Sequence, residues 1–230
     1  RVDQATQDSL PYPEFLLRLL ADEVERRDAK MLETRLRKAS FEQHKTLEDF
    51  DFLFNPQVPK ARINDLATCG FVSRRRNVLI VGPSGVGKSH IAQALGHRAC
   101  RAGFKTLYTA ATDMLKHLRA ARGDDSYDRR MLRFTAPDLL IIDDVGLRKM
   151  SVEEAGDLYE VIRLRHQRGS IVATSNRDVG EWPGIFHDAL LASAALDRLF
   201  EDAAVITIPG DSYRNPPAKK HSGRRSKEKT

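Results

Sequence analysis

Hydrophobic residues recur at helical spacing in the first part of the chain and form short continuous runs in the rest. Residues 13–39 carry apolar side chains three or four positions apart among mostly charged residues. Pro13 lies where the first turn of a helix tolerates proline, and Glu23 and Arg27 have the spacing of a stabilising ion pair. The pattern predicts one long amphipathic helix. Its apolar stripe consists of Phe15, Leu16, Leu19, Leu20, Val24, Met31, Leu32 and Leu36.

An aromatic connector follows this helix. Residues 42–62 contain Pro56 and Pro59, which interrupt regular structure. Three aromatic side chains in the stretch need burial, and this favours a segment packed on a domain surface over a free linker. These side chains are Phe50, Phe52 and Phe54.

Strand and helix patterns alternate from about residue 77 onward. The run at 138–143 has four successive apolar positions, as expected for a strand that is covered on both faces. Ser151 and Glu154 have the spacing of a capping box at the start of a helix. The sequence therefore predicts an α/β fold, a parallel sheet flanked by helices. The predicted strands are 77–82, 105–110, 138–143, 170–176 and 204–210, and the predicted helices are 89–103, 112–124, 151–169 and 188–201.

The composition is that of a globular chain with a substantial core. The 230 residues are 41% hydrophobic and 30% charged, which excludes disorder of the whole chain. No apolar run approaches the ~18 residues needed to span a bilayer, so no membrane association is expected. Cys69 and Cys100 are too few for a disulfide framework and fit a reducing compartment, which predicts a cytoplasmic protein.

Positive charge is concentrated at the end of the chain. The net charge is +6, and residues 218–230 hold six Lys/Arg and one Glu. The preceding 217 residues therefore carry only +1, so net charge is weak evidence that the folded part binds nucleic acid.

A phosphate-binding motif follows the first predicted strand. The glycines allow a tight loop whose N–H groups surround a phosphate, and the next helix adds the positive end of its dipole. Lys88 would contact the β- and γ-phosphates, and the Ser89 hydroxyl would bind Mg²⁺. A chance glycine turn is disfavoured because the motif lies between a predicted strand and a predicted helix. The predicted nucleotide-binding residues are Gly82, Pro83, Ser84, Gly85, Val86, Gly87, Lys88, Ser89 and His90.

Two acids end the buried strand at 138–143. Asp143 would hold Mg²⁺ directly or through water, and Asp144 would orient the attacking water. The alternative is a strand that ends at a polar turn. Together with the loop, the acids predict a site for ATP or GTP with Mg²⁺.

The chain resembles the AAA+ ATPases of the helicase-loader clade, and most closely the IstB transposition helpers of bacterial insertion sequences. The matching stretches are GPSGVGKSHIAQALG, PDLLIIDDVG, TSNRDVGEW and ALLASAALDRLFEDAAVITIPGDSYR. The likeness runs from about Tyr12 to Arg214. It implies a P-loop AAA+ core at 61–214, preceded by a small helical region and connector at 1–60. A basic, disordered tail is expected at 215–230, and no C-terminal helical lid is expected.

The resemblance also implies roles that spacing alone does not give. Asn176 matches the sensor 1 residue, Arg198 the arginine finger that reaches the nucleotide of a neighbouring subunit, and Arg214 the sensor 2 residue. Each would meet charge on the γ-phosphate. Two departures are Ser84, where the family usually has proline, and Asp144, where many relatives have Glu. Because Asp is shorter by one methylene, we expect slow hydrolysis.

A basic segment lies between the second and third predicted strands. Residues 112–134 form two predicted helices and correspond to the insertion that lines the ring in the initiator and loader clade. A solvated helix face is the alternative for such a charge run. The candidate DNA contacts, all to phosphates, are Lys116, Arg119, Arg122, Arg129, Arg130 and Arg133. The triplet 74–76 is a second candidate patch or surface only, and the tail is a DNA-binding arm or a solubility feature.

The family likeness implies an ATP-dependent, DNA-binding transposition helper. ATP would drive assembly of a homo-oligomeric ring or spiral on double-stranded DNA, the assembly would recruit and stimulate the transposase of the same element, and ATP hydrolysis would release it. Two alternatives stay open. One is a DnaC-like loader of the replicative helicase, and the other is a nucleotide-gated scaffold that does not hydrolyse ATP.

Overall fold

The core is a five-stranded parallel sheet with strand order β2-β3-β4-β1-β5. The computed structural model describes residues 10–186 and 188–213. The strands are β1 (Val78–Val81), β2 (Thr106–Ala110), β3 (Leu139–Asp143), β4 (Ser170–Ser175) and β5 (Ala204–Thr207). All four strand pairs are parallel, so the carboxyl ends of β1, β3 and β4 share one edge of the sheet. The predicted strands and the parallel sheet are confirmed.

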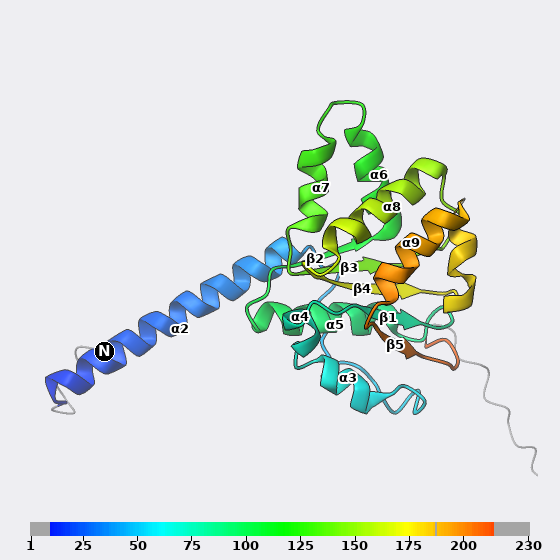
Figure 1. Cartoon of the computed structure of the whole chain (residues 1–230). Helices are drawn as coiled ribbons and strands as arrows, with labels where there is room; N and C mark the ends of the chain where they lie inside the picture. Colours follow the sequence, from blue (N-terminus) through cyan, green and yellow to red (C-terminus); the bar gives the residue numbers. More distant parts are fainter. Residues whose placement is uncertain (1–9, 187, 214–230) are drawn as a thin grey trace, which may run out of the picture.

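Helices cover both faces of the sheet, as Figure 1 shows. Alternate strand residues pack into two hydrophobic clusters, one on each side. One cluster includes α3 (Lys60–Leu66), α4 (Gly70–Ser73) and α5 (Lys88–Arg101). The other includes α6 (Ala111–Ala121), α7 (Tyr127–Thr135), α8 (Val152–Arg165), η1 (Val179–Ile185) and α9 (Ala189–Phe200). The short elements α3, α4 and η1 are absent from the sequence prediction.

The long helix α2 (Tyr12–Ala39) projects from this core (Figure 1). Its carboxyl-terminal end contacts α5 and β2, and Arg35 donates a hydrogen bond to the Cys100 carbonyl oxygen. Ala39 is its only buried residue. The predicted apolar stripe therefore exists, but most of it is exposed. The most exposed large apolar side chains of α2 are Tyr12, Leu16, Leu17, Leu20, Val24 and Met31.

The predicted connector packs on the core between α2 and α3. Phe50 and Phe52 are half-buried against the cluster around α5, as expected. Phe54 differs from the prediction because it remains 37% exposed, and its ring lies 4.7 Å from the Tyr213 ring. Phe50 and Phe52 thus attach the connector to the domain, whereas Phe54 is not buried.

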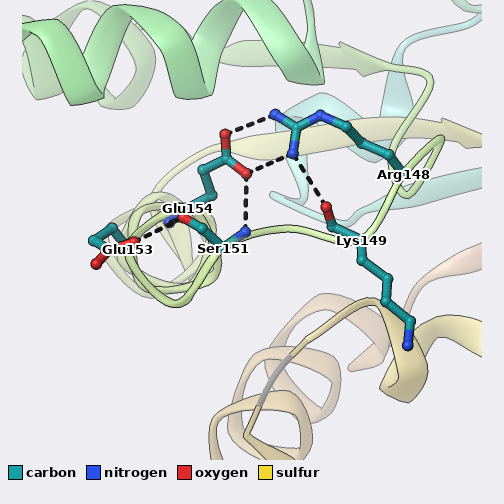
Figure 2. A network of polar contacts seen from close by, with 5 residues as sticks. All are labelled: Arg148, Lys149, Ser151, Glu153 and Glu154. Atoms are coloured by element: carbon teal, nitrogen blue, oxygen red, sulfur yellow. Dashed lines mark hydrogen bonds and ion pairs between the residues drawn. The ribbon is translucent and has the colours of Figure 1, made fainter.

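The start of α8 is fixed by the predicted capping box. Ser151 accepts a hydrogen bond from the Glu154 amide, and the Glu154 carboxylate accepts one from the Ser151 amide. Figure 2 shows that Arg148 binds the same carboxylate from the preceding loop. The described part of the chain contains no helix with the length and apolar character that a membrane span requires.

Candidate nucleotide-binding site

The glycine-rich loop runs from the end of β1 to the first residue of α5. Gly85 and Gly87 have φ values of 83° and 97°, a region that favours glycine. Neighbouring segments also press on both positions. A Cβ atom would lie 2.1 Å from the Ser212 hydroxyl oxygen at Gly85, and 2.6 Å from a ring carbon of Phe50 at Gly87. The loop therefore needs glycine both for its backbone conformation and for close packing.

Lys88 joins this loop to the end of β4. Its ammonium group donates hydrogen bonds to the Pro83 carbonyl oxygen, at 2.7 Å, and to the side-chain oxygen of Asn176. Only 4% of Lys88 is exposed. The structure thus brings together two predicted site residues that lie 88 positions apart in the sequence.

Asp143 is held by hydroxyl groups from the strands on either side of β3. Tyr108, on β2, donates to one carboxylate oxygen at 2.7 Å, and Thr174, on β4, donates to the other. Burial and the neighbouring carboxylate raise the pKa of Tyr108 well above its usual value, so its hydroxyl remains a donor at neutral pH. Asp143 is 5% exposed, and its carboxylate orientation is therefore fixed from two sides.

Thr174 also holds the backbone of the second acid. Asp144 has a φ of 55°, and its amide donates to the Thr174 hydroxyl at 2.9 Å. The Val145 amide donates to the Thr174 carbonyl oxygen at 2.8 Å, and the Ser175 hydroxyl donates to the Val145 carbonyl oxygen at 2.8 Å. The end of β4, next to Asn176, therefore fixes the turn that carries both acids.

A cavity of about 570 Å³ lies at the carboxyl edge of the sheet. Its lining includes the loop from Ser84 to His90 together with Asp143, Asp144 and Asn176. Gly82 and Pro83 lead from β1 into this lining. The size and the convergent polar groups suit a nucleotide.

One wall of the cavity is formed by residues that the sequence did not predict to be there. The connector was expected only to pack on the domain. Its alternation of aromatic and acidic residues could have indicated that it also lines the cavity. It contributes Glu42, Gln43, Lys45, Asp49, Phe50, Asp51, Phe54 and Asn55. Tyr108 and Thr174 were also missed, because their role depends on which strands are neighbours.

His90 links the connector to α5. Its Nε2 lies 2.7 Å from the Thr46 carbonyl oxygen, and the Phe50 ring contacts it edge-on with centroids 5.2 Å apart. Burial lowers the pKa of His90, so the ring is neutral at pH 7 and donates through Nε2. The residue therefore positions the connector over the loop.

The oxygen atoms at the cavity fit a magnesium ion that arrives with a nucleotide. The Ser89 hydroxyl and the Asp143 carboxylate are hard donors of the kind that Mg²⁺ prefers. Within residues 10–186 and 188–213, no group of three or more His, Cys, Asp or Glu side chains could form a cage for a metal. In nucleotide sites, Mg²⁺ commonly combines one or two protein ligands with phosphate oxygens.

Of the two arginines predicted to meet the γ-phosphate, Arg198 and Arg214, only Arg198 lies among the described residues. Arg198, on α9, lines a separate cavity of about 390 Å³ at the opposite, amino edge of the sheet. Its guanidinium donates to the Ala194 carbonyl oxygen at 2.7 Å. It is thus away from the nucleotide cavity of its own chain. Arg214 lies outside the described residues, whereas Tyr213 lines the nucleotide cavity and its amide donates to the Gly85 carbonyl oxygen at 2.9 Å.

The basic segment forms two helices, α6 and α7, that pack side by side and point away from the sheet (Figure 1). Two of the six candidate DNA contacts are engaged within the chain. Arg122 forms an ion pair with buried Asp157, and Arg130 one with Asp124 at 2.9 Å. The other four candidates, Lys116, Arg119, Arg129 and Arg133, are exposed.

Known proteins with similar sequences carry insertion-sequence names. The model of the family "IstB-like ATP binding protein" matches residues 1–222. An insertion-sequence ATP-binding protein of Mycobacterium tuberculosis is 39% identical over 215 residues, which cover 93% of this chain and 86% of the relative. The ATP-binding protein of insertion sequence IS5376 from Geobacillus stearothermophilus is 36% identical over 212 residues, which cover 92% of this chain and 84% of the relative.

A solved structure matches the fold. The replication initiator DnaA, bound to AMPPCP and single-stranded DNA, has a TM-score of 0.62 at 21% identity. The match covers 75% of this chain and 52% of that one.

Proposed function

Because this chain belongs to the family of IstB-like ATP-binding proteins of insertion sequences, we propose that it is an AAA+ ATPase that helps a transposase capture double-stranded DNA. ATP binding is the family property. Hydrolysis, assembly on DNA and recruitment of the transposase are the proposed steps. The observation that carries the proposal is that Lys88, Asn176 and the two acids meet in a single cavity.

The chemistry within one chain follows from the roles of the cavity residues. The loop N–H groups and Lys88 hold the β- and γ-phosphates, and Ser89 and Asp143 would hold Mg²⁺. Mg²⁺ bound there would neutralise charge that develops on the phosphate oxygens. Asp144 orients the water that attacks the γ-phosphate, and Asn176 contacts that phosphate from the end of β4.

Arg198 completes the site of a neighbouring copy. Its place at the amino edge supports this proposal, because it lies away from its own nucleotide cavity and next to a surface that another copy can approach. A guanidinium at the γ-phosphate stabilises the transition state, and Arg214 would add a second cation. Hydrolysis therefore depends on assembly.

Assembly on DNA uses surfaces away from the cavity. The exposed basic side chains of α6 and α7 contact phosphates of a duplex with little sequence preference. The exposed apolar face of α2 offers a surface for stacking of copies or for the transposase. ATP hydrolysis then releases the assembly from the DNA.

Replacing Lys88 tests the proposal most directly. We expect Lys88→Ala to weaken ATP binding by about 100-fold or more, because a buried cation that contacts phosphate is lost. Titration with a fluorescent ATP analogue measures the affinity. Lys105→Ala removes an exposed lysine outside the cavity and is the matched control. Equal affinity of the Lys88→Ala and control proteins would refute the assignment of the loop.

Two further measurements separate the remaining alternatives. A transposition helper binds long duplexes and the transposase without a helicase, whereas a helicase loader binds the replicative helicase and prefers single strands. Pull-down with each partner and gel shifts with both forms of DNA distinguish them. Tight ATP binding without turnover at saturating DNA would identify a non-hydrolysing scaffold.

A further inference from the structure

Three successive arginines, Arg74, Arg75 and Arg76, form a turn before β1 that is called the arginine turn below. Arg74, Arg75 and Arg76 are all exposed, and the function proposed above uses none of them. Arg75 has a φ of 58°, and its guanidinium donates to the Gln167 carbonyl oxygen at 2.9 Å. The turn is therefore held against the end of α8.

Buried Asn77 fixes the turn from its other side. Its side-chain amide donates to the Leu199 carbonyl oxygen at 3.0 Å, and its side-chain oxygen accepts from the Ile171 amide at 2.9 Å. The arginine turn is thus tied to α9 and β4. The backbone that carries these arginines is therefore held in place by hydrogen bonds. Such a backbone suits a recognition surface.

The arginine turn and Arg198 line the same cavity at the amino edge of the sheet. Five arginines and two carboxylates line this cavity, so the net charge of its lining is +3. One of the two carboxylates, that of Glu201, contacts the His166 ring. Burial lowers the pKa of Arg165 to about 10, so this fifth arginine stays charged at neutral pH. The lining charges are Arg74, Arg75, Arg76, Arg165, Arg198, Glu201 and Asp202.

The nucleotide cavity at the carboxyl edge has the opposite charge. Five carboxylates face two lysines in its lining, a balance of −3. Three of these carboxylates, Glu42, Asp49 and Asp51, are exposed on the connector. A bound ATP–magnesium complex adds further negative charge. The two edges of one chain are therefore electrostatically complementary, and they face away from each other across a parallel sheet.

We propose that the arginine turn docks on the acidic connector of an adjoining copy of this chain. The inference rests on the assembly proposed above and names the surfaces that meet. Such a contact is heterologous, so it repeats from copy to copy and builds a ring or a helical filament. It places Arg198 at the neighbour's nucleotide, and it strengthens when ATP is bound because the acidic side becomes more negative.

A local explanation for the arginines exists. Helices α8 and α9 end in this cavity, and cations near a helix carboxyl terminus stabilise its dipole. That role predicts that loss of an arginine changes thermal stability and leaves assembly intact. The docking role predicts the reverse, so the two can be separated.

Charge reversal tests the docking. We expect Arg74→Glu and Glu42→Lys each to raise the protein concentration needed for nucleotide-driven assembly by about tenfold or more. Both side chains are exposed, so the variants should fold, and thermal unfolding checks this. A chain with both changes should assemble more readily than either single variant, because each altered surface again meets a charge of opposite sign on the adjoining copy. Sedimentation velocity with a non-hydrolysable ATP analogue is the measurement.

The control and the outcomes are specific. Arg62→Glu makes the same charge change at an exposed position of α3 that lines neither cavity, and it should assemble normally. Unchanged assembly of Arg74→Glu, or failure of the double change to restore it, would overturn the docking alone. A wild-type chain that binds nucleotide and never assembles would overturn both the docking and the proposed oligomer. The affinity of Arg74→Glu for nucleotide at low protein concentration should equal that of wild type.

Discussion

At the scale of single residues, the Thr174 hydroxyl forms hydrogen bonds with both Asp143 and Asp144. Its hydrogen is donated to the Asp143 carboxylate, and its oxygen accepts from the Asp144 amide. The geometry of both acids therefore depends on one side chain near the carboxyl end of β4.

We expect Thr174→Val to lower the turnover number by about tenfold or more and to change ATP affinity little, because the phosphate-binding loop is untouched. The Mg²⁺ concentration required for tight nucleotide binding should rise as well. Thr174→Ser retains the hydroxyl and should recover most of both properties. A serine variant as impaired as the valine variant would point to packing and would exclude the hydroxyl as the cause.

The candidate site was predictable where its chemistry is contiguous in sequence. The loop from Gly82 to Ser89 and the acid pair are local motifs, and both line the cavity or lead into it. Tyr108 and Thr174 were not predictable, because a hydroxyl on one strand reaches Asp143 only when the strand order is known. The roles of Asn176 and Arg198 came from family likeness. The structure places Asn176 beside Lys88 and Arg198 in the other cavity.

At the scale of secondary-structure elements, the start of α8 combines a cap with an ion pair (Figure 2). Arg148 binds the Glu154 carboxylate through two hydrogen bonds of 2.7 and 2.8 Å. These bonds lower the pKa of Glu154 to about 2. The Glu154 side chain is 6% exposed and that of Arg148 is 55% exposed, so solvent screens part of the interaction.

This geometry predicts a pH-dependent contribution of Glu154 to stability. We expect Glu154→Gln to lower the free energy of unfolding by about 1–2 kcal/mol at pH 7. The pKa is lower in the folded than in the unfolded chain, so the stabilisation is complete above about pH 4.5 and is lost as the pH falls toward 2. Urea denaturation across this range measures the difference. Glu33→Gln, at an exposed position of α2, is the control, and a Glu154→Gln deficit that stays constant from pH 7 to 3 would contradict the assignment.

The long helices and strands were predictable because their hydrophobic residues recur at a regular spacing and polar residues mark where each element begins and ends. Residues 138–143 and 170–176 are apolar runs bounded by polar residues, and they became β3 and β4. The short α4 and η1 lacked a period long enough to detect, and strand order is a property of tertiary packing that one sequence does not encode locally. The exposure of Phe54 depends on its contact with Tyr213, which is distant in sequence.

At the scale of the whole molecule, the position of Arg198 predicts that hydrolysis is shared between chains. Arg198→Ala should bind ATP with wild-type affinity and lose most of its turnover, and Asp144→Asn should do the same. In an equal mixture, about a quarter of the junctions join an intact Asp144 to an intact Arg198 from the neighbour. We therefore expect the mixture to recover up to about that fraction of wild-type activity.

ATPase assays of each variant alone and of the mixture, at one total protein concentration, measure this recovery. An inactive mixture that still assembles would exclude an in-trans role for Arg198.

The connector has a mechanical consequence. It forms one wall of the nucleotide cavity and continues directly into α2, whose 28 residues extend about 42 Å at ~1.5 Å per residue. A rotation of roughly 5° at the root of this helix moves its far end by about 4 Å, if the helix stays straight. A small movement of the connector around a bound triphosphate would therefore displace the free end of α2 by about the length of a side chain.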